Sequence, residues 1–202
     1  MHQAARSEAM IRKLLAAAES LFLARSYADV TMDLIAEKAQ VTKGALYHHF
    51  ASKEDLYLAM MAADLEAKRD LFVAAASSAS GCRERLRRLT AAYFALPREK
   101  RDLIQLVRRD TNVFRDPVRA RLVRLYQAAL PQPVERIMAE GMRDRELRAA
   151  DSRLLAWQFI ALVELTLNRY AAKVLPDDGA RLDYVLDLFF RGADGQRKKE
   201  EA

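Results

Sequence analysis

The sequence predicts an all-α protein, with an N-terminal three-helix module of helix-turn-helix type and a larger helical domain after it. Three observations lead to this fold. The chain has only six Gly and five Pro in 202 residues and is rich in Ala, Leu, Arg and Glu, which favour helix. No stretch alternates apolar and polar residues as a strand would. Between residues 31 and 56, three Ser or Thr residues, Thr31, Thr42 and Ser52, each precede a short apolar pattern, which is the position of a helix cap.

The first 56 residues contain the three predicted helices of the N-terminal module. The first helix ends near Tyr27 and has apolar residues at helical spacing: Ile11, Leu14, Leu15, Ala18, Leu21 and Phe22. The second helix begins after Thr31 and the third after Thr42. The loop between them, residues 40–42, has the length of the turn in a helix-turn-helix motif.

The third of these helices has two different faces. Leu46 and Phe50 fall together on a helical wheel, with Tyr47 at their edge, and can pack on neighbouring helices. The opposite face is small at its N-terminal end and polar further on: Gly44, Ala45, His48 and His49. A small face lets the backbone approach DNA closely, and free N–H groups at a helix start attract phosphate. The pattern therefore predicts a helix that enters the major groove.

Individual side chains on this face suit DNA contact. Lys43 and Lys53 can bind phosphates, Tyr47 and the two histidines can donate to phosphate oxygens, and the Ala45 methyl can touch a thymine methyl. The alternative is a three-helix module that serves packing only. A metal site at His48 and His49 is not expected, because adjacent helix positions point about 100° apart.

The segments LFLARSYADVTM and LIAEKAQVTKGALYHHFASKEDL resemble the DNA-binding domain of the TetR family of bacterial transcription regulators. The resemblance implies an operator-binding surface that includes the cap of the second helix and the start of the fourth: Thr31, Thr42, Lys43, Gly44, Ala45, Tyr47, His48, His49 and Lys53. Gln40 departs from the family, which usually has Gly in this turn, where a positive φ is expected, and we expect a cost of about 1 kcal/mol for Gln. The N-terminal arm has only Arg6 before Arg12 and Lys13, so minor-groove contact by the arm is not expected.

The rest of the chain is predicted to be helical, with a DNA-binding domain at 1–56, an effector-binding and dimerisation domain at 57–192, and a disordered polar tail at 193–202. Pro, Gly and Ser clusters separate the predicted helices. These helices span about residues 52–76, 83–95, 100–112, 117–142 with a break at Pro131 and Pro133, 151–173 and 180–191.

The helix expected at 151–173 is apolar on nearly every side, so it must be buried on every side. One chain of this size has difficulty covering it, and a second copy of the same helix would complete the burial. We therefore predict a homodimer with twofold symmetry, through a four-helix bundle. The alternative is a deeply buried core helix in a monomer. The predicted interface residues are Leu155, Phe159, Leu162, Val163, Thr166, Tyr184 and Leu188. Two recognition helices related by a twofold imply a palindromic operator.

The resemblance also implies a small-molecule effector, bound among the central helices. The candidate pocket residues are aromatic, apolar or polar side chains of that region: Tyr93, Phe94, Leu106, Arg109, Asn112, Phe114, Tyr126, Trp157, Glu164 and Asn168. Glu164 and Asn168 stand four residues apart and so share one helix face. The Glu164 carboxylate has three possible partners: a ligand, an Arg of a neighbouring helix, or the other subunit.

Residues 98–124 contain nine basic and four acidic side chains. Two interpretations remain open for this region. It is either a solvated arginine-rich face, or the mouth of a site for an anionic effector such as a carboxylate or an acyl-coenzyme A, with Arg108 or Arg109 at its entrance.

Composition limits the remaining function classes. The only cysteine, Cys82, excludes an internal disulfide and suits a reducing cytoplasm, and the longest apolar run is too short to span a bilayer. Neither a cofactor nor a metal is expected, and the chain lacks a catalytic constellation. Residues 1–56 hold seven basic and seven acidic side chains, which argues against an architectural DNA-packaging protein. We therefore expect a cytoplasmic, ligand-responsive repressor. An activator, or a regulator without a ligand, is the alternative.

Overall fold

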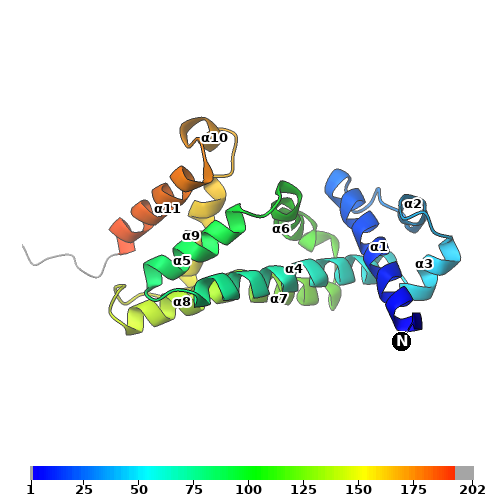
Figure 1. Ribbon diagram of the computed structural model, residues 1–202, viewed down its shortest axis with the longest axis horizontal. Coiled ribbons are helices and arrows are strands. Elements are labelled where there is room, and N and C mark those ends of the chain that lie inside the picture. Colours follow the sequence, from blue (N-terminus) through cyan, green and yellow to red (C-terminus); the bar gives the residue numbers. More distant parts are fainter. Residues whose placement is uncertain (1, 194–202) are drawn as a thin grey trace, which may run out of the picture. The chain divides into compact units, whose positions relative to one another are not determined.

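The computed structural model describes residues 2–193, and this part of the chain is helical throughout, without a strand (Figure 1). The predicted all-α fold is confirmed. The described helices are α1 (His2–Ala24), α2 (Met32–Lys38), α3 (Lys43–His49), α4 (Lys53–Ser77), α5 (Cys82–Phe94), α6 (Arg98–Asp110), the 3₁₀ turn η1 (Thr111–Val113), α7 (Val118–Ala129), α8 (Pro131–Arg143), α9 (Ser152–Leu165), α10 (Ala171–Val174) and α11 (Asp178–Ala193). Apart from residue 193, the tail predicted at 193–202 lies outside the described residues.

The helices group into two compact units. Unit 1 combines residues 1–66 with residues 98–126, and unit 2 combines residues 67–97 with the described residues from 127 onward. Unit 1 is therefore not one continuous segment, because α6, η1 and most of α7 pack with the N-terminal helices. The predicted functional boundary at residue 56 does not coincide with this division and stays a prediction.

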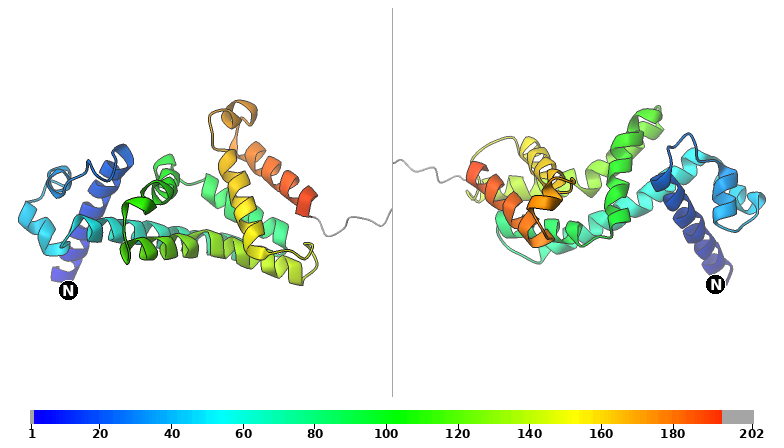
Figure 2. Two further views of the ribbon diagram at one scale, coloured as in Figure 1. Left: turned by 180° about the vertical axis from the view of Figure 1, so that it is seen from behind. Right: turned by 90° about the horizontal axis from the view of Figure 1, so that it is seen from above.

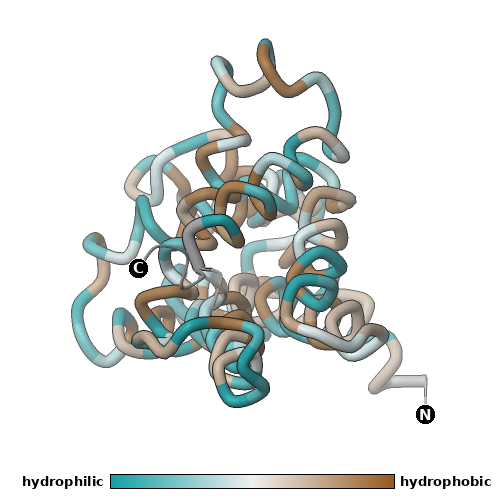
Figure 3. Tube along the Cα trace, turned by 90° about the vertical axis from the view of Figure 1, so that its left-hand side faces the viewer, coloured by the Kyte–Doolittle hydropathy of each residue, from teal (hydrophilic) through white to brown (hydrophobic). Residues whose placement is uncertain are grey.

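The core of unit 1 is formed by the apolar faces that the sequence pattern indicates. Leu14 and Phe22 of α1, Ile35 of α2, Leu46 of α3 and Tyr57 of α4 are fully buried. Apolar and polar residues alternate along the helical turns, as the hydropathy colours of Figure 3 show. Burial of these side chains holds the short helices α2 and α3 in place, since helices of seven residues are not stable alone.

Unit 2 is a helical bundle in which α5, α8, α9 and α11 pack together (Figure 2). Its core includes the fully buried Leu86, Val134, Ala156 and Val185. Gly141 of α8 lets that helix approach α5, because a Cβ atom there would lie only 2.8 Å from the Cβ of Cys82. The only cysteine is thus a packing residue beside a helix crossing.

The break predicted near Pro131 is confirmed, since α7 ends at Ala129 and Pro131 occupies the first turn of α8. The continuous helix predicted at 151–173 is wrong, because α9 ends at Leu165. The Thr166 hydroxyl donates to the carbonyl of Val163 (2.7 Å), and the side chain of Asn168 accepts from the backbone N–H of Ala171 (2.7 Å). These side chains compete with the helix's own hydrogen bonds and favour an end and a restart.

None of the helices in the described range is both long and apolar enough to cross a bilayer. Among the same residues no cluster of His, Cys, Asp or Glu could hold a metal ion.

Two helices end in a non-glycine residue of left-handed conformation. Gln40 has φ 52° after α2, and Arg145 has φ 63° after α8. In both turns the backbone bonds form a Schellman motif: Val41 donates to Ala36 (3.0 Å) and Gln40 to Glu37 (2.9 Å), and residues 145 and 146 repeat this pattern on residues 142 and 141. The positive φ expected where the TetR family has Gly is confirmed.

Replacing Gln40 with Gly should stabilise the protein by about 1 kcal/mol, because an L-residue bears a steric cost in this conformation that Gly does not. The midpoint of denaturant unfolding measures this gain. Glu37→Gly is the matched control: its exposed site is helical, so we expect a loss of about 1 kcal/mol. A loss at both positions would show that the turn does not strain Gln40.

Candidate functional site

The predicted caps of the N-terminal module are present. The Thr31 hydroxyl accepts from the backbone N–H of Leu34 at the start of α2, and the Thr42 hydroxyl accepts from that of Ala45 at the start of α3, both at 3.2 Å. Ser52 accepts from the N–H of Asp55 (3.0 Å) and donates to the Asp55 carboxylate (2.7 Å). Helices α2, α3 and α4 therefore each start directly after the residue that the sequence predicts as the cap.

The orientation of α3 agrees with the prediction from the helical wheel. Leu46 is fully buried, and Phe50 just after the helix is buried as well. Tyr47 is 44% exposed even though it carries a large aromatic ring. Thr42, Lys43, Gly44 and His48 are exposed, while Ala45 and His49 are half-buried. The face opposite the core thus presents a tyrosine, two histidines and a lysine around a small centre.

Gly44 has no structural reason to be glycine. A Cβ atom built there would meet nothing within 4 Å, and its φ is not in the region that glycine favours. A glycine inside a helix costs about 1 kcal/mol relative to alanine. The open space above Gly44 is therefore consistent with close approach of something outside the chain.

Lys43 is exposed but already engaged. Its ammonium group forms an ion pair with Asp33 of α2 (2.7 Å), which holds the pKa of Lys43 above its usual value by hydrogen bonding. At neutral pH Lys43 is positively charged with or without this rise in its pKa. A phosphate that binds Lys43 would have to compete with Asp33 for it.

Lys53, at the start of α4, has a second task that the sequence did not reveal. Its ammonium group donates to the carbonyl oxygens of Tyr27 (2.8 Å) and Val30 (2.7 Å) and lies 4.2 Å from the centre of the Tyr27 ring. Partial burial lowers the pKa of Lys53. The residue thus ties the α1–α2 loop to α4, and one N–H donor remains for a ligand.

Unit 2 contains a small apolar pocket between α5, α8 and α9. Its free volume of about 20 Å³ suffices for about one water molecule. Two predicted effector residues, Tyr93 and Glu164, are among its lining residues, and so are Phe159 and Val163, which were predicted at the dimer interface. The other lining residues are Leu89, Thr90, Leu130, Val134 and Ile160.

Thr90 is the cavity residue that sequence reasoning missed. It is 1% exposed, and its hydroxyl oxygen has no hydrogen-bond partner among the described residues. An unsatisfied buried hydroxyl is costly, so it indicates a missing partner. The available signal was an aliphatic hydroxyl side chain within the apolar part of the predicted helix 83–95.

The remaining effector candidates do not converge on this cavity. Leu106, Arg109, Asn112, Phe114 and Tyr126 belong to unit 1. In unit 2, Phe94 is buried beside Tyr93, Trp157 is half-buried, and Asn168 is exposed and caps α10. Leu106 and Arg109 instead line an open groove of unit 1, together with Leu23, Glu99, Asp102, Gln105 and Arg108.

The predicted dimer residues divide into two groups. Leu155, Phe159, Val163 and Thr166 are already buried within one chain, whereas Leu162 is half-buried and Tyr184 and Leu188 are exposed. A shallow groove beside α9 and α11, which we call the α9–α11 face, is lined by six apolar side chains, some exposed and some buried, and by two polar ones: Arg148, Leu155, Gln158, Ala161, Leu162, Leu165, Leu188 and Phe189. Leu165, which is 57% exposed, also lines this face.

Comparison with known proteins identifies the family to which the chain is similar. The model of the family "Bacterial regulatory proteins, tetR family" matches residues 14–60. The transcriptional activator FasR of Mycolicibacterium smegmatis is 30% identical over 150 residues, which are 74% of this chain and 67% of FasR. Two solved regulators share the fold. AibR, in complex with isovaleryl coenzyme A and operator DNA, has a TM-score of 0.73 at 20% identity, over 89% of this chain and 97% of that one.

The second structure is FadR from Bacillus subtilis in complex with stearoyl-CoA, with a TM-score of 0.75 at 17% identity, over 90% of this chain and 98% of that one. The family match covers α2 and α3, which carry the exposed face around Gly44, together with the second half of α1 and the start of α4. The chain belongs to the TetR family of DNA-binding transcriptional regulators, which are not enzymes.

Proposed function

We propose that this regulator binds a palindromic operator as a homodimer, through the face of α3, and that a small-molecule effector changes its affinity for DNA. The observation that carries the DNA interface is the exposed set around Gly44, on a helix whose caps and packing are complete without it. DNA in bacteria lies in the cytoplasm, so the regulator would act there.

Repression is the simplest regulatory outcome, because a bound dimer excludes other proteins from a promoter. A specific observation favours activation as the second candidate, since FasR is named as an activator. The position of the operator relative to the promoter separates the two outcomes.

The α9–α11 face supports the homodimer. Leu165 and Leu188, which line this face, are about half exposed in a single chain, and so are Leu154 and Tyr184 on the same two helices. Exposed apolar side chains clustered on adjacent helices favour burial against a partner. A second copy related by a twofold would cover both faces at once and would place two α3 helices for a palindrome.

The cavity of unit 2 supports an effector with an apolar chain and a hydrogen-bond donor or acceptor. Its lining is mostly Leu, Val, Ile and aromatic side chains, and the Thr90 hydroxyl and the Glu164 carboxylate supply polar groups. AibR and FadR are described with acyl-coenzyme A molecules, so we propose an acyl-coenzyme A or a related acyl compound. A short chain would displace fewer side chains from so small a cavity than a long one.

Selection from fragmented genomic DNA tests the proposed function. We expect the wild-type protein to recover a palindromic sequence, and Tyr47→Ala to lose most of its affinity for that sequence while it keeps the wild-type melting temperature, because Tyr47 lies outside the core. Leu71→Ala, an apolar surface change on α4 far along the chain from α3, is the matched control and should bind normally. Enrichment of no sequence would overturn the proposal, and normal binding by Tyr47→Ala would move the DNA contact elsewhere.

Leu188→Glu should weaken the dimer by about tenfold or more, because it places a charge on the apolar α9–α11 face. Leu188 is 46% exposed in one chain, so the fold should survive. Sedimentation equilibrium measures the dissociation constant. Leu71→Glu, at a site of similar exposure (40%), should leave the dimer intact. A Leu188→Glu dimer as tight as the wild type would place the interface on another surface.

Thr90→Val should raise the stability of the free protein by about 1 kcal/mol, since it removes an unsatisfied buried hydroxyl without a change of shape. The same variant should respond less to isovaleryl coenzyme A in a thermal-shift measurement, because the ligand loses its polar contact. Thr166→Val is the control: its hydroxyl donates to Val163, so its loss should destabilise the protein. An undiminished response of Thr90→Val would exclude a ligand contact at this hydroxyl.

A further inference from the structure

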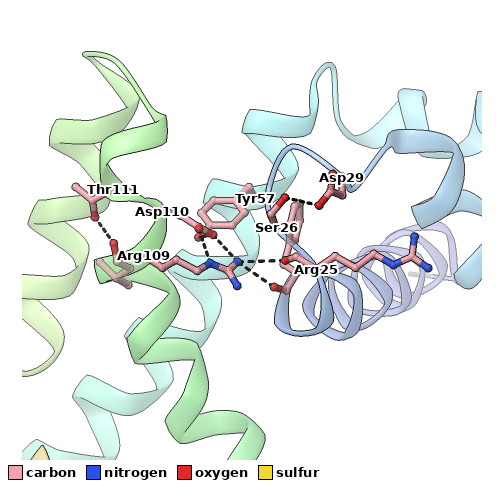
Figure 4. A network of polar contacts seen from close by, with 9 residues as sticks. Arg25, Ser26, Asp29, Tyr57, Arg109, Asp110 and Thr111 are labelled. Carbon is pink, nitrogen blue, oxygen red and sulfur yellow. Dashed lines mark hydrogen bonds and ion pairs between the residues drawn. The ribbon is translucent and has the colours of Figure 1, made fainter.

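The hydroxyl of Thr90 in unit 2 lacks the local hydrogen bond that threonine commonly makes in or beside a helix. Thr111, directly after α6, donates to the carbonyl oxygen of Val107 one turn earlier (Figure 4). Thr166, directly after α9, donates in the same way to the carbonyl oxygen of Val163. Thr90 is 1% exposed, and its hydroxyl oxygen has no hydrogen-bond partner among the described residues. This hydroxyl is therefore available to a partner from outside the chain.

The second polar group of the unit 2 pocket comes from another helix. Glu164 of α9 lines the pocket together with Thr90 of α5, and one oxygen of its carboxylate is buried. A carboxylate has about four acceptor sites, so it can accept from a ligand in addition to its contacts within the chain. The other lining side chains are apolar or aromatic. The pocket thus presents one group that donates and one that only accepts, within apolar surroundings.

The size of the pocket selects the kind of ligand group that fits between these two side chains. Its free volume of about 20 Å³ corresponds to one group of the size of a water molecule. A hydroxyl is close to water in size, and it both donates and accepts. It can donate to the Glu164 carboxylate while it accepts from the Thr90 hydroxyl. A carbonyl oxygen, as in a plain acyl thioester, can accept from Thr90 but has no donor for Glu164.

We propose that the effector is an acyl compound whose chain carries a hydroxyl group, which binds between Thr90 and Glu164. The inference rests on the proposed function, which supplies the acyl compound, and it adds the group on the chain by which that compound is recognised. Both residues belong to unit 2, so the site lies within one compact unit. Thr90 and Glu164 are then the residues that determine specificity.

The hydroxyl group should matter more than its size suggests. A site that forms hydrogen bonds to a ligand hydroxyl rejects the analogue without it, because its own buried polar group is then left unsatisfied. An unhydroxylated chain leaves the Thr90 hydroxyl against a methylene group, at the cost of a buried donor without an acceptor. A purely structural role of Thr90 would have another effect, since its loss would change the affinity for both compounds alike.

The test uses the full chain and two sets of probes in isothermal titration calorimetry. The first set contains butyryl-CoA and hydroxybutyryl-CoA with the hydroxyl on the second, third or fourth carbon of the chain. The second set contains free butyrate and the same three hydroxybutyrates, and it separates a coenzyme A thioester from a free acid as the carrier of the chain. The chain is short because the pocket is small.

Four variants accompany the wild-type protein. Thr90→Val keeps the shape of the side chain and removes the hydroxyl, whereas Thr90→Ser keeps the hydroxyl. Glu164→Met keeps the length of the side chain and removes the carboxylate. Glu84→Gln, on the same helix as Thr90, is the control, because it breaks only an exposed pair with Arg88.

We expect the wild-type protein, Thr90→Ser and Glu84→Gln to bind one hydroxylated probe about tenfold or more tightly than the unhydroxylated probe of its set. Thr90→Val and Glu164→Met should bind the same two probes with affinities within about threefold of each other. The melting temperature without ligand shows whether each variant is folded. Should Glu164→Met fail to fold, the contrast between Thr90→Val and Thr90→Ser decides alone.

Two results would overturn the inference while the proposed acyl effector stands. The first is a wild-type protein that binds butyryl-CoA or butyrate as tightly as every hydroxylated probe of the same set. The second is a preference for the hydroxyl that survives in folded Thr90→Val or Glu164→Met. If neither set of probes binds the wild-type protein, the proposed acyl effector fails, and the inference fails with it.

Discussion

The proposed DNA-facing surface depends on two helices that are too short to persist alone. Helices α2 and α3 have seven residues each, and nucleation of a helix is costly enough that isolated segments of this length do not form in water. They exist because Thr31 and Thr42 satisfy their first N–H groups and because Ile35 and Leu46 are fully buried. The Schellman turn at Gln40 then fixes the angle between them. Local hydrogen bonds at helix ends thus determine where α3 points.

The charged groups of the N-terminal module also have structural roles. The segment 1–56 is formally neutral, so its affinity for a polyanion cannot come from net charge. Two lysines that are candidates for phosphate contact also have partners within the protein. Lys53 fastens the α1–α2 loop through two carbonyl oxygens, and Lys43 is paired with Asp33. Placement of a few donors around α3, and not a basic field, is what distinguishes this surface.

Local patterns predicted the fold where the physics is local. Caps, helical periodicity and loop length are encoded within a few residues, which is why the starts of α2, α3 and α4 and the inward position of Leu46 follow from the sequence. The end of α9 was missed because Thr166 and Asn168 lie in an otherwise apolar run, and their capping bonds outweigh the periodic pattern. A side-chain hydroxyl or amide can end a helix that hydrophobicity alone would continue.

The candidate sites were harder to predict, because their residues meet through packing. Thr90 has no distinctive sequence context, and only the arrangement of α5, α8 and α9 shows that its hydroxyl is enclosed. Arg109 was assigned to a pocket on the basis of regional charge, whereas its guanidinium lies on the carbonyls at the end of α1. Glu164 does line the cavity, as its position in an apolar helix suggested. The residues of these sites are brought together by contacts between segments that are far apart in the sequence, and sequence spacing does not reveal such contacts.

The ion pair between Asp33 and Lys43 has a consequence for how the regulator searches a chromosome. A phosphate that engages Lys43 must displace a carboxylate held at 2.7 Å, so a loosely placed backbone gains less from this lysine than a well-placed one does. Binding to arbitrary sequence, which relies on phosphate contacts, is weakened more than binding to a fitted site, where neighbouring contacts hold the phosphate in position. On the proposed DNA interface, Asp33 would therefore reduce the time spent on irrelevant DNA, so that an acidic residue beside α3 would contribute to selectivity.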